Sequence, residues 1–376
     1  MQVAILAAGF TAGEADQLRR SMAAWKRKGG LQQYYDKIVN GMTERGYEKA
    51  FAEQIFEQIK GFSEYGFPES HAASFALLVY ASCWLKHHHP AEFLAAMLNS
   101  QPLGFYSPSQ LVQDAQRHDV EVRAVDVMRS DWDCTLEDLP HPPAVRLGLR
   151  MVNGLKEASA ERVMQSRAQA PFDDPEDLAR RASLEQHEMQ LLAGADALKS
   201  LSGHRRQQVW QASALRRPPK LMHDAVVEED FLELAPALEG EEVVHDYNTV
   251  GLTLRSHPML LLRPALARRK LARASDLDHV PNGRFVRYAG IVTVRQQPET
   301  AKGTVFISLE DETGNVQVIV WPSLKEAQRP EVLRARLLAV YGQWQREGEV
   351  KNLIAHKLAD LTPMLGRLAT TSRDFQ

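Results

Sequence analysis

The sequence has little of what marks the specialised protein classes. Its 376 residues include two cysteines, Cys83 and Cys134, and no Cys-x-x-Cys pair. This excludes a disulfide scaffold and a cysteine-based zinc finger, and it fits a reducing compartment. The longest apolar stretch, 72–85, is interrupted by serines and is shorter than the roughly 20 residues of a membrane span. We therefore expect a cytoplasmic protein with no membrane partner, and we interpret the apolar opening, 1–10, as a buried helix rather than a signal peptide.

An excess of either charge is also missing. The chain has 45 Lys and Arg against 48 Asp and Glu, a net charge of −3, so binding to nucleic acid would need local basic patches. The sequence has no Walker A loop, no G-x-S-x-G and no H-E-x-x-H motif. The nearest acidic pair, Asp131 and Asp133, has no third carboxylate to help hold two Mg²⁺ ions. The sequence thus predicts no catalytic residue and no metal site in this chain.

Length and hydrophobic patterning indicate several domains. The length exceeds what one core usually spans, and the 44% of hydrophobic residues is typical of globular proteins. A proline-rich boundary is expected at 139–144, and 221–246 holds nine acidic residues and no Lys or Arg before a basic run at 263–273. Helical periodicity predicts helices over 12–25, 47–59, 71–89 with Ser70 as N-cap and Pro90 as its end, 91–100, and again through 146–217, with a strand over 121–127.

The last part of the sequence is typical of an OB-fold, a five-stranded barrel that binds oligonucleotides. Strands are predicted over 285–294, 304–311, 315–321, 337–344 and 350–358, with a helix over 323–333. Basic and aromatic residues alternate there, the pattern that holds single strands. Arg287, Lys302, Phe306 and Arg346 are the candidate DNA-binding residues. The other basic residues are Arg284, Arg295 and Lys351, and the other rings are Phe285, Tyr288, Trp321 and Trp344, each of which could instead belong to the barrel core.

Residues 145–167 are typical of a helix-hairpin-helix, in which a glycine-bearing turn presents backbone amides to a DNA phosphate. Asn153, Gly154 and Lys156 are the candidate contacts, although lysine stands where the motif has its second glycine. A weaker copy spans 188–210, with Gly194 at the turn followed by Arg205 and Arg206. An ordinary pair of antiparallel helices explains either segment equally well.

Taken in order, these segments resemble the C-family of bacterial DNA polymerases, the polymerase III alpha subunit family. The resemblance is carried by QVAILAAGFTAGEADQLRRSMAAWKRK (2–28), GFPESHAASFALLVYASCWLKHHHPAEFLAAMLNSQPLGFY (66–106) and VDVMRSDWDCTLE (125–137). The hairpin and TVFISLEDETGNVQVIVWP (304–322) follow in the family's order. SDWDCTLE and the ending LGRLATTSRDFQ are most similar to the error-prone, damage-inducible branch.

The resemblance implies an α+β multidomain protein. It assigns 1–125 to the C-terminal part of the helical fingers, 126–220 to a helix-hairpin-helix region, 221–280 to an acidic then basic linker with short helices, 281–364 to the OB-fold and 365–376 to a tail. The catalytic aspartates and their Mg²⁺ belong to a palm domain that these residues do not include. Arg19 and Arg20 match the ADxLRR element that faces the incoming dNTP, and His71 matches the neighbouring SHAA element.

Two further hypotheses stay open beside the error-prone polymerase. One is a non-enzymatic DNA-binding module made of the hairpins and the barrel, in which Arg19 and Arg20 would have no nucleotide role. The weaker one is an RNA-binding barrel of the tRNA-anticodon type. Under the polymerase hypothesis the partners are primer-template DNA, single-stranded template and dNTP. Because no Q-x-x-[LM]-x-F clamp-binding motif is found, accessory proteins are expected to link the enzyme to the sliding clamp.

Overall fold

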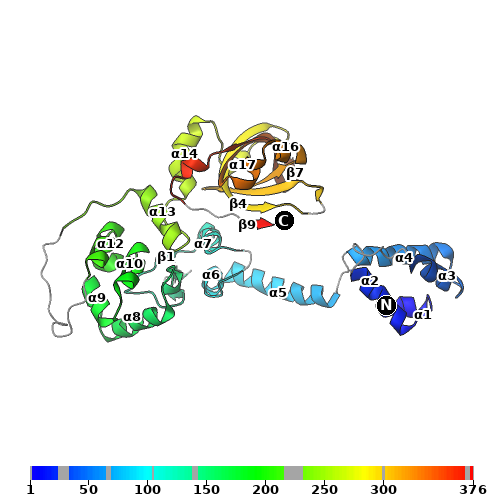
Figure 1. Ribbon diagram of the computed structural model, residues 1–376, viewed down its shortest axis with the longest axis horizontal. Helices are drawn as coiled ribbons and strands as arrows, with labels where there is room; N and C mark the ends of the chain where they lie inside the picture. The colour runs from blue at the N-terminus through cyan, green and yellow to red at the C-terminus, as the bar shows by residue number, and fades with distance from the viewer. Residues whose placement is uncertain are drawn as a thin grey trace. The chain divides into compact units, whose positions relative to one another are not determined.

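The computed structural model describes residues 2–23, 34–64, 69–103, 106–137, 143–215, 232–298, 301–368 and 373–375. They divide into two compact units, Met1–His88 and His89–Gln376 (Figure 1). The first boundary thus falls well before the one expected after residue 125. The reason is packing, since Leu94 and Leu98 share a hydrophobic core with Val145 and Leu147 of the following region. Among the described residues, no helix is long and apolar enough to cross a membrane.

The first unit is helical, as predicted. Leu18, Ile38, Met42 and Phe56 form the centre of its core. The apolar opening was expected to be a buried helix, but only Ala4 is buried in its single short helix. The N-cap prediction was wrong too, because the 20-residue helix starts at Glu69 and includes Ser70. The helices are α1 (Gln2–Leu6), α2 (Ala12–Ala23), α3 (Tyr35–Thr43), α4 (Lys49–Glu64) and α5 (Glu69–His88).

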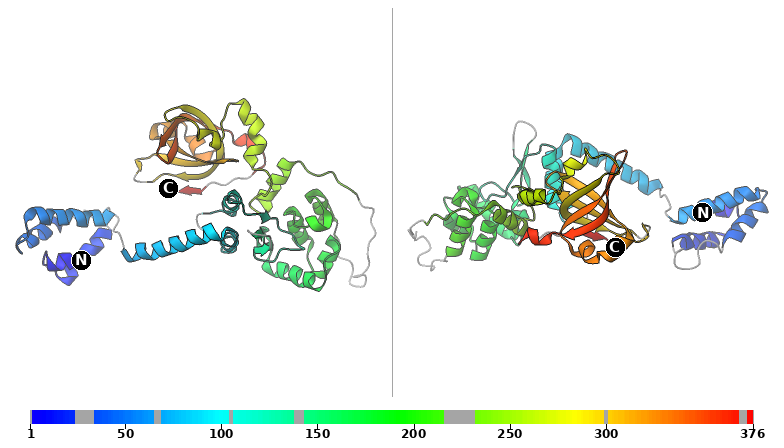
Figure 2. Two further views of the ribbon diagram at one scale, coloured as in Figure 1. Left: turned by 180° about the vertical axis from the view of Figure 1, so that it is seen from behind. Right: turned by 90° about the horizontal axis from the view of Figure 1, so that it is seen from above.

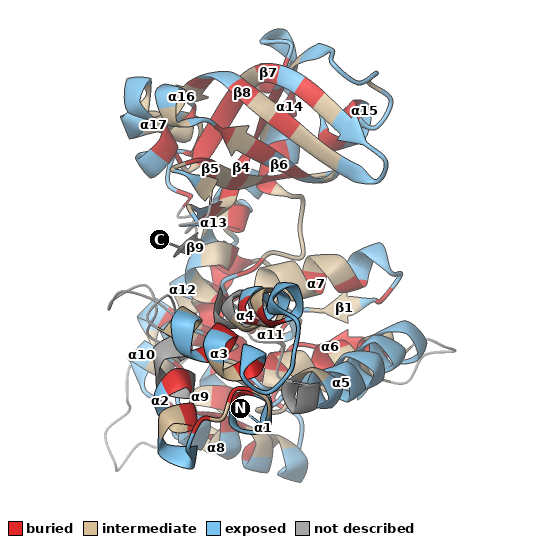
Figure 3. Cartoon of the chain, turned by 90° about the vertical axis from the view of Figure 1, so that its right-hand side faces the viewer, coloured by how far each residue is buried: buried red, intermediate tan, exposed pale blue. Residues whose placement is uncertain are grey.

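Helix α5 exposes an unusual amount of apolar surface. Figure 3 shows it in the colour of exposed residues along most of its length. Because the large apolar residues follow one another closely, they lie on every side of the helix and not on one stripe. The exposed ones are Phe75, Leu77, Leu78, Val79, Tyr80, Trp84 and Leu85. An apolar surface of this extent usually marks a contact with another polypeptide or a liability to aggregate.

The second unit begins with a helical region around a small sheet. The sheet has the order β1-β3-β2, and the strand predicted over 121–127 is reduced to Val122–Arg123. Within the described residues, the helices expected over 146–217 are confirmed from Glu157 to Ala214, after a first short 3₁₀ turn. The elements are α6 (Pro90–Asn99), α7 (Pro108–Arg117), β1 (Val122–Arg123), β2 (Thr135–Glu137), β3 (Ala144–Arg146), η2 (Leu149–Met151), α8 (Glu157–Gln169), α9 (Pro175–Arg181), α10 (Gln186–Gly194), α11 (Lys199–Ser202) and α12 (Arg205–Ala214).

The described part of the expected linker, 232–280, is packed structure. It forms α13 (Glu239–Thr249), α14 (Pro258–Arg268) and α15 (Ala274–Leu277). Val243 of α13 and Met259 and Leu266 of α14 are buried in a cluster with residues of the barrel wall. This region therefore covers part of the barrel and does not hang between two domains.

The predicted barrel is confirmed. Its strands run in the order β5-β6-β8-β7-β4, and a β5–β4 pairing closes the ring (Figure 2, right). Tyr288 and Trp344 lie in its core. The helix predicted over 323–333 is present but divided at Gln328. The elements are β4 (Phe285–Gln296), β5 (Val305–Asp311), β6 (Gly314–Val320), α16 (Pro322–Ala327), α17 (Arg329–Arg334), β7 (Leu337–Glu347), β8 (Val350–Asp360), η5 (Thr362–Leu365) and β9 (Arg373–Phe375), which pairs with β4.

Candidate nucleic-acid interface

The first hairpin, between η2 and α8, has its predicted turn exposed. Gly154 has φ +86°, a conformation that side-chain-bearing residues rarely adopt. Lys156 is exposed and is the N-cap residue of α8. The first amides of a helix have no acceptor inside it, so they are available to an anion beyond its N-terminus. The turn therefore offers amides and one cation, while Glu157 in the first helical turn reduces the local positive charge.

Asn153 holds this turn in place. Its backbone N–H donates to the Thr249 carbonyl at 2.8 Å, and its side-chain amide donates to the Asn248 carbonyl at 3.1 Å. Both acceptors lie at the end of α13. The side chain of Asn153 therefore positions the hairpin, and contact of Gly154 and Lys156 with DNA stays a prediction.

The second hairpin is covered, which corrects the prediction for Gly194. This glycine is the last residue of α10, and a Cβ atom there would lie 3.3 Å from Cγ2 of Thr249 on α13. The four residues after it, Ala195 to Leu198, are buried. The small side chain of Gly194 thus allows α13 to approach, and this turn is closed to a DNA phosphate.

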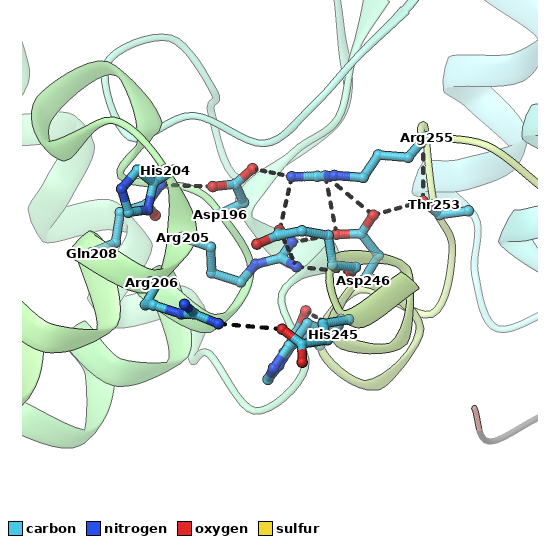
Figure 4. A network of polar contacts seen from close by, with 12 residues as sticks. Asp196, His204, Arg205, Arg206, Gln208, His245, Asp246, Thr253 and Arg255 are labelled. Atoms are coloured by element: carbon cyan, nitrogen blue, oxygen red, sulfur yellow. Dashed lines mark hydrogen bonds and ion pairs between the residues drawn. The ribbon is translucent and has the colours of Figure 1, made fainter. Parts of the chain in front are cut away.

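Arg205 also differs from its prediction, because it lies in a buried ionic network that joins α12 to α13 (Figure 4). It is 3% exposed. Its guanidinium pairs with Glu242 at 2.8 Å and with Asp246. A guanidinium neutralised by two buried carboxylates is unavailable to a phosphate, so its role is structural.

Arg255, in the loop between α13 and α14, completes this network. Its guanidinium lies 2.9 Å from a carboxylate oxygen of Asp196 and 3.0 Å from one of Glu242. The hydroxyl of Thr253 donates to Asp246 at 2.6 Å. The network thus fixes α13 over the second hairpin. The network was not predictable from the sequence, because its members are up to 59 residues apart and no local motif links them.

Arg206, the neighbour of Arg205, remains a candidate. It is exposed, and it donates to the Ala235 carbonyl at 3.1 Å and contacts Glu241 at 3.3 Å. Exposed pairs of this kind are weak. Arg206 therefore keeps the freedom to exchange Glu241 for a phosphate.

The open face of the barrel is formed by β5 and β6. Phe306 is half-buried and lies opposite Ile319 in the strand register. Ser308 and Gln317 lie opposite each other and are hydrogen-bonded through Ser308 Oγ and Gln317 Nε2 at 2.8 Å. Lys302 is exposed in the loop before β5. This face combines an apolar ring, polar side chains and a cation, which suits a single strand.

The other aromatic and basic residues of the barrel divide between core and surface. Tyr288 and Trp344 are buried, whereas Phe285 and Trp321 are 57% and 49% exposed. Arg295 is buried and donates to the carbonyls of Val332, at 2.7 Å, and Ala335. Exposure alone therefore leaves Phe285 and Trp321 as stacking candidates and excludes the other two rings.

Arg346 and Lys351 flank the turn between β7 and β8, and Asp278 contacts both. The Arg346 guanidinium donates to the Asp278 carbonyl at 3.3 Å, and the Lys351 ammonium lies 2.5 Å from the Asp278 carboxylate. Arg346 is exposed and its contact is with a neutral carbonyl group. It keeps its place as a candidate, while the charge of Lys351 is already matched.

The predicted nucleotide-binding residues fall largely outside what the structure describes. The backbone positions of Arg19 and Arg20 belong to α2, and that of His71 to α5. Their side chains lie outside the described residues. Their contact with a triphosphate therefore stays a prediction.

No metal site was predicted, and Asp131 and Asp133 are engaged elsewhere. Asp131 pairs with Arg167 at 2.6 Å and Asp133 with Arg150 at 2.5 Å. Within the described ranges, no three His, Cys, Asp or Glu side chains come together in a way that could hold a metal ion. These residues therefore do not fit the Mg²⁺ ions of a polymerase centre.

His257 and Glu310 tie α14 to the barrel and predict an acid sensitivity. Their side chains lie 3.2 Å apart. Burial by itself raises the pKa of Glu310, but hydrogen bonds from His257 and Gln113 outweigh it and hold this pKa below the usual 4.5. A carboxylate with a lowered folded-state pKa stabilises the fold above pH 4.5, and that contribution is lost as pH falls through the folded-state pKa.

We therefore expect stability to fall with decreasing pH below about 4.5, and Glu310→Gln to flatten part of this decline, because glutamine keeps a hydrogen bond but does not titrate. Urea unfolding of both proteins between acid and neutral pH measures the difference. Parallel pH profiles for the two proteins would contradict this role of Glu310.

Comparisons with known proteins agree with this arrangement. The family models that match are "Bacterial DNA polymerase III alpha subunit finger domain" at residues 1–46, "Helix-hairpin-helix motif" at 119–208 and "OB-fold nucleic acid binding domain" at 286–361. Over its whole length the chain is 56% identical to the error-prone DNA polymerase of Burkholderia pseudomallei and 55% identical to that of Ralstonia nicotianae. This chain is a homologue of error-prone DNA polymerases. It spans 36% of the length of these two relatives.

Likeness to solved structures adds nothing to this. Asparaginyl-tRNA synthetase from Pyrococcus horikoshii is 19% identical with a TM-score of 0.22, over 24% of this chain and 23% of that one. The hypothetical protein ygiW from E. coli is 9% identical with a TM-score of 0.20, over 24% of this chain and 89% of that one. The relation to error-prone DNA polymerases thus rests on sequence identity and on the order of the matched domains.

Proposed function

We propose that this chain is the C-terminal, DNA- and nucleotide-binding portion of an error-prone DNA-directed DNA polymerase that acts in the cytoplasm, in damage-induced translesion synthesis and repair. In this proposal the first hairpin holds the primer-template duplex and the β5–β6 face holds single-stranded template. Arg19, Arg20 and His71 face the incoming dNTP. Accessory proteins link the enzyme to the sliding clamp. Nucleotide transfer and its Mg²⁺ are assigned to a palm domain, and no catalytic step is assigned to this chain.

One observation carries the proposal. A chain that is 56% identical along its whole length to an error-prone DNA polymerase combines an exposed hairpin, with Gly154 and Lys156 at its turn, and a barrel with an open face. Phosphates bind at the amides of such a turn, and bases stack on exposed rings. The non-enzymatic DNA-binding module would use the same two surfaces, but Arg19 and Arg20 would then have no nucleotide to bind.

The duplex part is tested by Lys156→Glu in the full chain. We expect several-fold weaker binding to duplex DNA, with the slope of log affinity against log salt reduced by about 0.9 for one lost phosphate contact. Fluorescence anisotropy over a series of salt concentrations measures both. Lys199→Glu is the matched control, because Lys199 is an exposed lysine beside the covered second hairpin. Equal losses in the two variants would remove the hairpin from the interface.

The single-strand part is tested by Phe306→Ala. Loss of one stacked base costs roughly 1–3 kcal/mol of binding, so the affinity for single-stranded DNA should fall at least fivefold while duplex binding is kept. If this variant instead loses about 3 kcal/mol or more of folding stability, Phe306 is a core residue and not a stacking platform.

A further inference from the structure

The barrel has a second surface with basic and aromatic residues. This surface lies on β4, β7 and β8 and is separate from the β5–β6 face. Arg287 of β4 lies opposite Tyr341 of β7, and Tyr341 lies opposite Lys357 of β8. The guanidinium of Arg287 lies over the Tyr341 ring, 5.8 Å from its centre. The three side chains thus form one row across three neighbouring strands, with a cation at each end and a ring between them.

This row faces outward. Tyr288 follows Arg287, Val340 precedes Tyr341, and Leu358 follows Lys357. All three of these neighbours belong to the barrel core. Because successive side chains in a strand point to opposite faces, the row lies on the outer surface. Arg287 and Lys357 are exposed. In the part of the chain that the structure describes, neither is found in an ion pair with a carboxylate.

An exposed ring lies beside the row. Phe285 precedes Arg287 by two residues, so both lie on the same face of β4. It is 57% exposed, and its ring and that of His356 are in a T-shaped arrangement with their centroids 5.9 Å apart. A phenylalanine that is more than half exposed has ring surface available for stacking with a base. We call Phe285, Arg287, Tyr341 and Lys357 the β4–β7–β8 face.

The end of α14 adds more positive charge at the margin of this face. Leu266 and Leu271 pack in the same cluster as Tyr341. The backbone N–H of Ala272 donates to the Arg287 carbonyl at 2.8 Å. The residues between these anchors include exposed Arg268, Arg269 and Lys270. A chain with a net charge of −3 therefore gathers five cations in one region, and these favour a polyanion.

We propose that the β4–β7–β8 face is a second contact surface for single-stranded DNA, which extends the binding track beyond β5 and β6. This inference rests on the part of the proposed function that assigns single-strand binding to the barrel. Arg287 and Lys357 each contact a phosphate, and Phe285 stacks with a base. Single-stranded DNA is favoured over an acidic protein segment because the face offers an open ring beside its charges.

The test measures binding of the full chain to labelled oligothymidylates of about 5 and about 20 nucleotides, lengths that span the site sizes of OB-folds. The variant Arg287→Gln/Lys357→Gln should reduce the salt slope for the long strand by about 1.4, the value for two lost phosphate contacts. Phe285→Ala should weaken binding of the long strand at least fivefold. The short strand, which the β5–β6 face accommodates, should bind all of these variants like the unchanged protein.

The matched control is Arg329→Gln/Arg334→Gln, which removes two exposed charges from α17 of the same barrel. It should leave the salt slope unchanged. Circular dichroism establishes that each variant is folded, as expected for substitutions of exposed side chains.

Three results would overturn the inference, and each leads to a different conclusion about the barrel. If only Phe306→Ala weakens binding, the β4–β7–β8 face does not contact DNA, while the proposed function stands. If the double variant loses affinity and Phe285→Ala does not, the face recognises a polyanion without bases, such as an acidic protein segment. If the unchanged chain binds no single-stranded DNA at either length, the proposed role of the barrel falls as well.

Discussion

Arg205→Ala is expected to destabilise the region around α12 and α13 by about 3–5 kcal/mol, the usual cost of removing one partner from a buried ion pair. Arg205 is 3% exposed, and the carboxylates of Glu242 and Asp246 that it neutralises are buried too. Arg255 still contacts both acids, so the cost should fall at the lower end of that range. Amide hydrogen exchange of peptides from α12 and α13 measures it, because local opening exposes these amides.

Arg206→Ala is the natural control for this prediction. It removes the same side chain from the next position, where the guanidinium is exposed and its contact with Glu241 is 3.3 Å. Exposed ion pairs contribute roughly 0–1 kcal/mol, so exchange in α12 and α13 should hardly change. Similar effects of the two substitutions would contradict the structural role of Arg205. Faster exchange confined to α13 in Arg205→Ala would indicate that the network holds this helix in particular.

Trp344→Ala is expected to cost the barrel about 3–5 kcal/mol, because it removes a large ring from a closed core. Trp344 is 3% exposed and lies in the same cluster as Tyr288 and Leu353. Within the described residues its indole N–H has no hydrogen-bond partner. Trp344→Phe should therefore cost much less, since it keeps an aromatic ring and removes an unpaired buried donor. Hydrogen exchange of β7 and β8 reports both effects.

Trp321→Ala provides the matched comparison. This tryptophan is 49% exposed at the start of α16, and substitutions of exposed residues usually change stability by less than about 1 kcal/mol. If Trp321→Ala lowers the stability as much as Trp344→Ala does, Trp321 is not a surface residue. A stable Trp344→Ala protein would contradict the closed core.

The barrel was predictable because its signal is local. Each of its five strands is a run of at least seven residues rich in β-branched and apolar side chains, and glycine marks three of the turns between them, at Gly303, Gly314 and Gly348. The register was not predictable, and it decides which side chains share a face. Tyr341 and Lys357 lie 16 residues apart and were missed, although strand alternation places both outward once β7 is paired with β8.

The hairpin region shows the same limit. The turn at Gly154 was predictable because a turn is a local feature, and the left-handed backbone at Gly154 fits that prediction. Arg205 and Gly194 were misassigned because α13 is distant in the sequence: it contacts Arg205 through Glu242, 37 residues later, and Gly194 through Thr249, 55 residues later (249 − 194). Sequence patterns state which residue types surround a turn, but not which distant helix packs on it.

The exposed apolar surface of α5 has a consequence for the amount of this chain in a cell. Chaperones and proteases continuously remove proteins that open or leave apolar segments uncovered. A 20-residue helix with seven exposed large hydrophobic side chains presents such a segment without any unfolding. When these residues are produced by themselves, their yield should therefore depend on whether a polypeptide that covers α5 is produced with them.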